Sequence, residues 1–442
     1  MVHLSEAAGP RSELPTRRVI SAPTRDALAL GALALAVRVF WVLVYGRTTG
    51  APNDTVFYQV AASSLAHGDG FRALGGNVTA HWPPGFPFLV SLPYRVFGVH
   101  PHLGLWINVV LATATAILLY LVARRMLGRP AALFTGTAFA LLPGPVLFTG
   151  LFLSETTFIF MLVGFLALAI FLPDRRWTPV VLGVAVGLAA LTKGEGLLLL
   201  LIPIAMWSGL HVRGEVVRRS AVLVAVAALT ILPWTIRNVV VMDSFIPVST
   251  NASTTLWSGH NPNANGGPTY APPELLGRIP KGLPPRQAEV EEAGLLRREA
   301  VDWAVHNPHK ELGLIPRKLV ALNNGTSGAI DTWFNAGRER QLPTSSRILY
   351  GVIADAAGHF LLFLTLAALL VLGARRLWHI HPGMRGVLAY LGACLVLYGF
   401  VYYGQYRYRV PMEPLMLLVA APVVAAVWAR RDILRRGIAG DG

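Results

Sequence analysis

The sequence predicts an all-α polytopic membrane protein with about ten transmembrane helices. Three observations predict this fold class: 54% of the 442 residues are hydrophobic, only 14% are charged, and the mean hydropathy is +0.53. One soluble core of this length could not bury so much apolar surface. The net charge of +15 comes mostly from Lys and Arg in short links between apolar segments. This pattern is typical of membrane topology and argues against a nucleic-acid partner.

The first apolar segment, residues 27–45, predicts a retained transmembrane helix. Residues 1–26 hold charges and prolines without an apolar core, and no small-residue cleavage site is visible, so we do not expect a signal peptide. The basic residues of this tail place it in the cytoplasm. The single cysteine, Cys394, lies in an apolar run, which excludes an intrachain disulfide and a thiolate metal cluster.

The loop that follows, residues 47–101, therefore lies on the outer side of the membrane. Its residues 55–66 carry apolar side chains at helical spacing and predict an amphipathic helix in the membrane interface, capped by Asn53 or Asp54. Residues 86–97 are apolar but too short and proline-broken to cross, which predicts a re-entrant or interfacial segment. The carboxylate of Asp54 is thus a candidate general base for a substrate that is partly lipid.

Nine further apolar segments complete the predicted spans, with basic clusters at their cytoplasmic ends and both termini inside. With the first span they make up a transmembrane half, residues 27–236, and the closing spans of residues 347–430. Between spans seven and eight, residues 237–346 are polar and predict a modest extracytoplasmic region with helices at 285–306 and 308–323. Residues 431–442 form a cytoplasmic tail. The nine segments are about 103–122, 131–148, 151–172, 178–192, 196–210, 220–236, 348–374, 386–403 and 411–429.

Polar residues next to the membrane segments fall almost entirely on the predicted outer side. Ionisable groups at that depth are costly unless they face a polar cavity or one another, so one shared outer-leaflet cavity explains them most simply. Its cations suit an anionic substrate, its acids suit general-base chemistry, and the apolar helices around it suit a prenyl chain. A polyprenyl-phosphate sugar combines these properties. The residues are Asp54, His81, Glu155, Lys193, Glu195, Arg237, Asn238, His260, Asn261, Arg407 and Arg409.

Several motifs in this order resemble the C-type superfamily of membrane glycosyltransferases. The similar branch contains the protein O-mannosyltransferases and the aminoarabinose transferase that modifies lipid A. The resemblance covers about residues 50–420 and implies inverting transfer from a polyprenyl-phosphate sugar to an acceptor on the outer face, without a nucleotide sugar. The motifs are YQVAASSLAHGDGF, PPGFP, LSETTF, LTKGEGLLLL, LPWTIRN, VSTNASTTLWSGHNPNANGG and QYRYRVPMEP.

The resemblance also implies roles for individual residues. Asp54 matches the catalytic acid of the first loop, which deprotonates or orients the acceptor, and Glu155 matches a second acidic position, which helps hold the acceptor or a metal. Arg407 and Arg409 match a basic motif that neutralises the donor phosphate, and Lys193 stands at a further phosphate-binding position. Candidate substrate contacts are Tyr58, His81, Glu195, Arg237, His260, Asn261 and Tyr406.

The first loop departs from the relatives in two places. Asn53-Asp54 lacks the Asp-Glu pair of the mannosyltransferases, and His81-Trp82 stands where the lipid A enzymes carry Glu-Lys. A divalent metal held by His81 and His260 is a further prediction, although two histidines fall short of a full site. No other cofactor is expected.

Other interpretations stay open at this stage. Asp54 is also suited to cap a helix, Glu155 to cap the fourth span with Ser154, Lys193 to pair with Glu195 across a hairpin, and the two arginines to reach lipid headgroups. A lipid-linked-sugar transporter or flippase, or a non-catalytic protein that binds such lipids, is the alternative to an enzyme. The acceptor (lipid, glycan or protein) and the sugar stay open.

Overall fold

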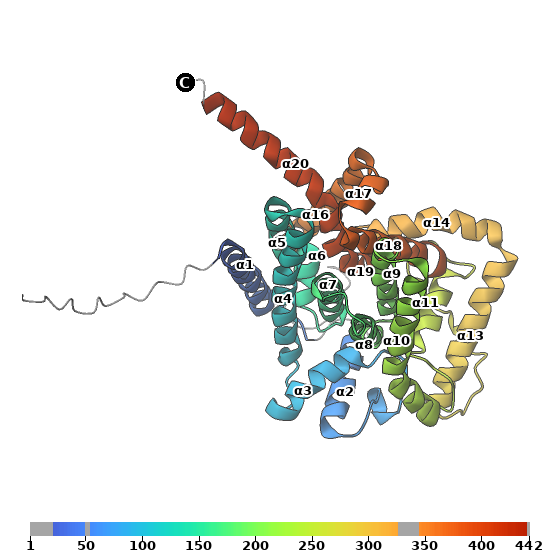
Figure 1. The fold of residues 1–442 in the computed structure, drawn as a ribbon. Coiled ribbons are helices and arrows are strands. Elements are labelled where there is room, and N and C mark those ends of the chain that lie inside the picture. Colours follow the sequence, from blue (N-terminus) through green and yellow to red (C-terminus); the bar gives the residue numbers. More distant parts are fainter. Residues whose placement is uncertain (1–20, 49–53, 326–343, 440–442) are drawn as a thin grey trace, which may run out of the picture.

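The computed structural model describes residues 21–48, 54–325 and 344–439, and in these residues every regular element is a helix (Figure 1). Six helical segments are long and apolar enough to cross a membrane, which confirms a polytopic α-helical membrane protein. They are α1 (Ala22–Tyr45), α4 (His102–Leu127), α10 (Arg213–Met242), α16 (Thr344–Leu372), α18 (Pro382–Val396) with the π-helical turn η3 (Leu397–Val401), and the run of α19 (Tyr406–Arg409), η4 (Val410–Met412) and α20 (Glu413–Ala439).

Four of the ten predicted spans are shorter or broken. The third is bent by 49° at Leu142 between α5 and α6. The fourth, fifth and sixth have helices of at most 17 residues, fewer than the roughly 20 that a full crossing takes. The number of ten spans is therefore not confirmed, although each predicted segment contains a helix. These helices are α5 (Arg129–Leu141), α6 (Pro143–Thr149), α7 (Glu155–Phe171), α8 (Thr178–Ala190), η2 (Gly194–Leu200) and α9 (Leu201–Trp207).

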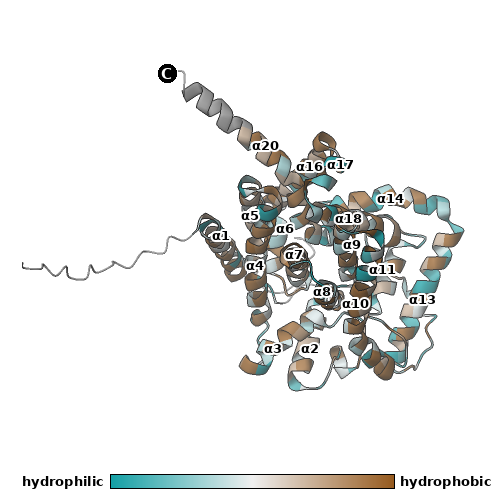
Figure 2. Ribbon diagram, viewed as in Figure 1, coloured by the Kyte–Doolittle hydropathy of each residue, from teal (hydrophilic) through white to brown (hydrophobic). Residues whose placement is uncertain are grey.

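Helix α4 and the N-terminal part of α20 lie at the centre of the bundle, whereas the C-terminal part of α20 projects away from it (Figure 1). Their apolar stretches are 50% and 67% buried, whereas those of α10 and α16 are only 17% and 22% buried. Most apolar side chains of α10 and α16 therefore point outward, where a lipid bilayer would cover them. Figure 2 shows these bundle helices as largely hydrophobic, while α13 (Pro285–His306) and α14 (Pro308–Asn323) carry hydrophilic stretches.

The first loop folds into two helices, α2 (Asp54–His67) and α3 (Gly85–Phe97), with a short turn η1 (Leu74–Gly76) between them. Gly68 and Gly70, with φ of 88° and 82°, end α2 in a conformation that other residues avoid. Helix α3 has 13 residues, about 20 Å, which is too short to cross a membrane. Its exposed Phe88, Val96 and Phe97 agree with the predicted interfacial segment.

Gly85 connects the first loop to the helix bundle through a main-chain hydrogen bond. Its main-chain N–H donates to the carbonyl of Leu191 at 2.7 Å, and a Cβ at Gly85 would lie 2.8 Å from that oxygen. The start of α3 is thereby held beside the end of α8, two residues before Lys193.

The polar region between spans seven and eight contains α11 (Asn251–Gly259), α12 (Pro273–Leu276), α13 and α14. Helices α13 and α14 coincide with the predicted 285–306 and 308–323, each starting at a proline, and form an arm along one edge of the molecule (Figure 1). The predicted end of the seventh span at residue 236 is wrong, because α10 continues to Met242. Arg237 and Asn238 are accommodated inside this helix since their side chains bond loop carbonyls.

Candidate functional site

The two acids of the candidate site each begin a helix. Asp54 is the first residue of α2, and Glu155 is the first residue of α7. A carboxylate is stabilised at a helix N-terminus by the unpaired main-chain N–H groups there. The side chain of Ser154 makes no capping hydrogen bond to α7, and Glu155 is held by ion pairs, so the capping interpretation of Glu155 is wrong.

Arg407 joins these acids. Its Nη1 lies 2.5 Å from Oδ2 of Asp54, and its Nε donates to Oε1 of Glu155. Lys193 Nζ lies 3.1 Å from the same Oε1 of Glu155. The structure therefore brings four predicted residues, from α2, α7, the α8–η2 link and α19, into one cluster, which we call the charged cluster: Asp54, Glu155, Lys193 and Arg407.

Members of the charged cluster differ in how far solvent reaches them. The side chains of Asp54, Arg407 and Lys193 are 16%, 14% and 10% exposed, whereas that of Glu155 is fully buried. The first three side chains are thus partly accessible to solvent. Glu155 is placed to act as the internal counter-ion that holds both cations in position.

Tyrosine side chains line the charged cluster. Lys193 lies over the ring of Tyr408 at 5.9 Å from its centroid, and Tyr408 stacks on Tyr398 at 4.8 Å. Tyr398 donates a hydrogen bond of 3.1 Å to Oε1 of Glu195. The interpretation that Lys193 pairs with Glu195 is thus wrong, because Lys193 pairs with Glu155 instead.

Tyr58 closes the cluster on the α2 side. Its hydroxyl lies 3.4 Å from Oγ of Ser154, and its side chain is buried. Burial, together with the negative charge of Asp54, raises the pKa of Tyr58 above its usual value. Tyr58 therefore stays a neutral hydroxyl beside the acids.

His81 lies near Asp54 but is held by a different set of groups. Its ring packs against Trp82 at 4.0 Å between centroids, and its main-chain carbonyl accepts from Asn251 N–H. Burial lowers the pKa of His81, while the charges of Glu289 and Asp54 act in the opposite direction. His81 is neutral at ordinary pH and borders the charged cluster.

Arg237 and Glu289 hold the segment of the first loop around residues 71–81 by hydrogen bonds. Arg237 donates to the carbonyls of Thr79 at 2.7 Å and Phe71 at 3.0 Å. The Glu289 carboxylate of α13 accepts from Oγ1 of Thr79 at 2.7 Å, from Ala80 N–H at 3.0 Å and from Oγ1 of Thr250 at 3.0 Å. In this structure Arg237 supports the loop that carries His81.

His260 and Asn261 lie in a separate polar network. His260 Nδ1 is 2.8 Å from Oε2 of Glu311, and Nε2 is 2.8 Å from the carbonyl oxygen of Val401. The amide of Asn261 donates to Oγ1 of Thr269 at 2.7 Å. Burial lowers the pKa of His260, and the charge of Lys318 acts in the same direction.

A metal site is not formed by these residues. In the part of the chain that the structure describes, no group of three or more His, Cys, Asp and Glu side chains could hold a metal ion. Both ring nitrogens of His260 already have protein neighbours, and Asp54 and Glu155 share Arg407. The donor set of these described residues does not fit a divalent ion. The divalent metal of the sequence analysis stays a prediction.

Arg409 and Tyr406 have partners outside the charged cluster. Arg409 pairs with Glu413, its Nε lying 3.3 Å from Oε1, and both side chains are 2% exposed. Tyr406 stacks on Phe148 with ring centroids 5.9 Å apart. The predicted phosphate-binding pair of arginines is thus divided between two environments.

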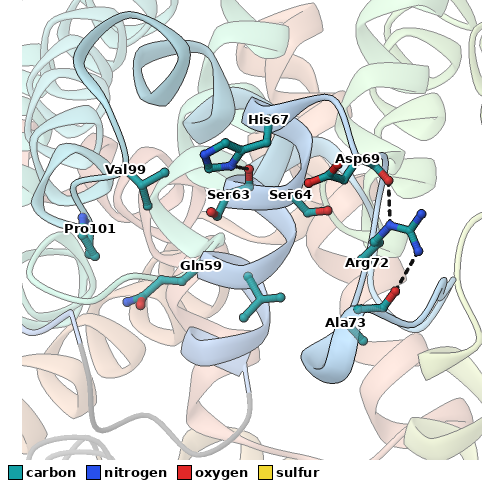
Figure 3. A pocket seen from close by; sticks show the side chains of 11 residues that line it. Gln59, Ser63, Ser64, His67, Asp69, Arg72, Ala73, Val99 and Pro101 are labelled. Atoms are coloured by element: carbon teal, nitrogen blue, oxygen red, sulfur yellow. Dashed lines mark hydrogen bonds between the residues drawn. The ribbon is translucent and has the colours of Figure 1, made fainter.

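An open depression of about 650 Å³ lies beside α2 (Figure 3). It is lined by Ser63, Ser64 and His67 of α2 and by Asp69 and Arg72. The side chain of Arg72 donates hydrogen bonds to the main-chain carbonyls of Asp69 and Gly76. None of the predicted site residues lines this depression.

A second, apolar depression of about 500 Å³ lies between α4, α7 and α8. Met161 belongs to its lining and accepts a hydrogen bond of 3.3 Å from Thr192, the residue before Lys193. One lining residue therefore contacts the chain next to Lys193. Its lining residues are Leu118, Phe160, Met161, Gly164, Phe165, Ala167, Leu168, Phe171, Leu172, Ala185 and Leu188.

Comparison with known proteins finds similarity over part of the chain. Residues 81–236, which include Glu155 and Lys193, match the family described as dolichyl-phosphate-mannose-protein mannosyltransferase. A segment of 243 residues is 28% identical to undecaprenyl phosphate-alpha-4-amino-4-deoxy-L-arabinose arabinosyl transferase 1 of Pseudomonas fluorescens, covering 50% of this chain and 41% of that protein.

The comparison with solved structures finds a similar fold in one case and a weaker likeness in another. The crystal structure of the Archaeoglobus fulgidus oligosaccharyltransferase is similar, with a TM-score of 0.54, 15% identity, and coverage of 94% of this chain and 52% of that one. The structure of ArnT from Cupriavidus metallidurans bound to undecaprenyl phosphate has a TM-score of 0.45 at 17% identity, covering 91% and 77%.

Residues 81–236 thus match the mannosyltransferase family, and the fold of the chain is similar to that of the oligosaccharyltransferase. The chain spans less than half the length of the arabinosyl transferase that it matches and about half that of the oligosaccharyltransferase.

Proposed function

We propose that the protein is an inverting glycosyltransferase that moves a sugar from a polyprenyl-phosphate donor to an acceptor at the outer face of the membrane. The observation that carries this proposal is the charged cluster, in which Arg407 lies between the partly exposed Asp54 and the buried Glu155, with Lys193 beside them. Cations placed where a phosphate leaves, beside a carboxylate that can accept a proton, are what such a transfer needs.

The names of the matched proteins support the same class of donor. The name of the matched family contains dolichyl-phosphate-mannose, and the name of the matched relative contains undecaprenyl phosphate-alpha-4-amino-4-deoxy-L-arabinose. Both are sugars joined to a polyprenyl phosphate. The sugar itself stays open for this chain.

In the proposed step, a hydroxyl or amine of the acceptor attacks the anomeric carbon of the donor sugar. The new bond forms on the face opposite the carbon–oxygen bond to the phosphate, which breaks and leaves its electron pair on the phosphate oxygen. The acceptor proton passes to the carboxylate of Asp54. Arg407 and Lys193 stabilise the negative charge that develops on the leaving phosphate.

Glu155 acts in this proposal through the two cations and does not touch the reacting atoms. Its buried carboxylate balances their charge, because an unpaired buried charge would be strongly unfavourable. We further propose that the prenyl tail of the donor lies in the apolar depression between α4, α7 and α8, because its lining residue Met161 contacts Thr192, the neighbour of Lys193.

The proposed orientation places the charged cluster on the extracytoplasmic side and both termini in the cytoplasm. The ends of α4 and α10 away from the cluster carry basic residues, Arg124 and Arg125 on α4 and Arg213, Arg218 and Arg219 on α10, as expected for the cytoplasmic side.

The test uses Asp54→Asn in proteoliposomes. A panel of undecaprenyl-phosphate sugars serves as donor, a lipid and glycan extract of the host envelope serves as acceptor, and release of undecaprenyl phosphate is measured. We expect turnover to fall by about 100-fold or more, as for loss of a general base. Asp69→Asn is the control, because Asp69 is another acid of the first loop that is exposed and lies outside the charged cluster. Unchanged turnover in a folded Asp54→Asn variant would remove Asp54 from the mechanism.

A further inference from the structure

The two arginines of α19 point in different directions. Arg407 reaches Asp54 and Glu155, whereas Arg409, two positions later, reaches Glu413. Residues two apart on an α-helix project about 200° apart around its axis, so they cannot face the same ligand. Arg409 is also much less accessible, with 1% of its surface exposed.

Three helices enclose Arg409. Its Nε lies 3.3 Å from Oε1 of Glu413 in α20, and its Nη1 donates to the main-chain carbonyl of Asn323, the last residue of α14, at 3.3 Å. A Cβ at Gly358 of α16 would lie 2.4 Å from Nη2 of Arg409. The guanidinium is therefore packed directly against the backbone of α16.

Glu413 is enclosed in the same way from the other side. A Cβ at Gly144 of α6 would lie 2.8 Å from Oε2 of Glu413, so the carboxylate rests against the short helix after the bend between α5 and α6. The neighbouring Tyr406 stacks on Phe148 of the same helix. The ion pair is thus located where α6, α14, α16 and α20 meet.

We infer that Arg409 and Glu413 form a buried positioning pair, which fixes α19 against its neighbours and so holds Arg407 between Asp54 and Glu155. This inference rests on the proposed function and replaces donor-phosphate contact as the role of Arg409. Arg409 and Glu413 lie four residues apart in one helical run, so the pair keeps both buried charges neutralised. The hold on neighbouring helices comes from the bond of Arg409 to the carbonyl of Asn323 and from the contacts of the pair with Gly358 and Gly144.

Glycine substitutions test the pair without removing either charge. Gly358→Ala places a methyl group against Arg409, and Gly144→Ala places one against Glu413. Gly392→Ala in α18 is the matched control, since a Cβ there meets nothing within 4 Å. Alanine favours a helix more than glycine does, so a loss in Gly358→Ala cannot come from helix propensity.

We expect kcat to fall by about 10- to 100-fold in Gly358→Ala and Glu413→Gln, with the KM for the donor changed less than about threefold, because a small displacement of Arg407 mainly affects the transition state. The kcat of the double variant Gly358→Ala/Glu413→Gln should be little lower than that of either single variant, since both substitutions disturb the same contact. Gly392→Ala should behave as the wild type.

Donor-phosphate contact by Arg409 predicts the opposite for Glu413→Gln. Freed from its counter-ion, Arg409 would bind the phosphate better, and the donor KM would fall. That result, or wild-type kcat in both Gly358→Ala and Glu413→Gln, overturns the inference.

Hydrogen exchange of residues 404–412 tests the positioning pair without measuring sugar transfer. The inference requires that these residues exchange faster in Gly358→Ala than in Gly392→Ala. Absence of transfer by the wild type would overturn the proposed function and leave the exchange result to decide on the pair.

Discussion

Nη1 of Arg407 lies 2.5 Å from Oδ2 of Asp54, although 353 positions separate the two residues in the chain. In this ion pair the guanidinium of Arg407 holds the carboxylate of Asp54 in place. An arriving donor phosphate competes with Asp54 for Arg407. Donor binding would therefore free the carboxylate of Asp54 from Arg407, so that it can accept the proton of the acceptor.

This relationship predicts that the donor binds before the acceptor. In initial-rate kinetics, the product undecaprenyl phosphate should inhibit competitively against the donor and non-competitively against the acceptor, since it leaves last and occupies the site that the donor enters first. Competitive inhibition against the acceptor would contradict the proposed order. The assay uses the wild-type protein in proteoliposomes with the envelope extract as acceptor.

The apolar depression predicts a dependence on the length of the donor chain. Gly164 lines it, and a Cβ there would lie 4.0 Å from Leu118, so leucine at this position fills the depression without a backbone clash. Gly164→Leu should raise the KM for an undecaprenyl donor by about tenfold, the loss expected when a few prenyl carbons are no longer buried.

The same variant should leave the KM for a donor with a short farnesyl chain within about twofold of the wild type. Gly392→Leu, at an exposed position of α18, is the control. Equal effects of Gly164→Leu on long and short donors would show that the tail lies elsewhere.

Glu289 predicts a local effect on the first loop. Its carboxylate accepts from Thr79, Ala80 and Thr250, and Glu289→Gln replaces the charged acceptor by a weaker one. Hydrogen exchange of residues 71–82 should become about 10- to 100-fold faster, as expected for loss of 1.5–3 kcal/mol of charge-assisted hydrogen bonding. Glu291→Gln, on the exposed side of the same helix, should leave this exchange unchanged. An unaltered loop in Glu289→Gln would mean that Arg237 alone holds it.

The orientation can be read with cysteine labelling, because the native Cys394 is only 2% exposed and adds little background. Leu74→Cys, at a side chain that is 62% exposed in the first loop, should react with a membrane-impermeant maleimide in intact cells. Arg176→Cys, between α7 and α8, should react only after the membrane is opened. Labelling of the two positions in the reverse order would invert the proposed topology.

The sequence predicted most helices because their signals are local. Pro285 and Pro308 start α13 and α14, and Gly68 and Gly70 end α2, so these boundaries follow from residues next to them. The end of α10 was misplaced because Arg237 and Asn238 look like terminal residues. Their partners, the carbonyls of Thr79 and Ile246, are supplied by the folded loops and cannot be read from the helix itself.

The candidate site was predicted in part for the same reason. Asp54, Glu155, Lys193 and Arg407 all stand at ends of apolar segments, which placed them on one side of the membrane. Their pairing depends on how α7 packs against the α8–η2 link, and this is tertiary information.

Other partners escaped the sequence analysis altogether. The opposite directions of Arg407 and Arg409 depend on residues 406–409 being helical, although Glu413, four residues after Arg409, was a visible signal. Glu289 and Glu311 gave no signal at all, because each acts on a segment far away in the chain.

The most direct test of the central claim is mass spectrometry of the lipid that co-purifies with three forms of the protein. Asp54→Asn should retain an intact polyprenyl-phosphate sugar, because the donor binds but the acceptor is not deprotonated. The wild type should carry polyprenyl phosphate without the sugar, and Arg407→Met should carry neither. Polyprenyl phosphate without sugar in Asp54→Asn, or no polyprenyl lipid in any of the three, would contradict the account.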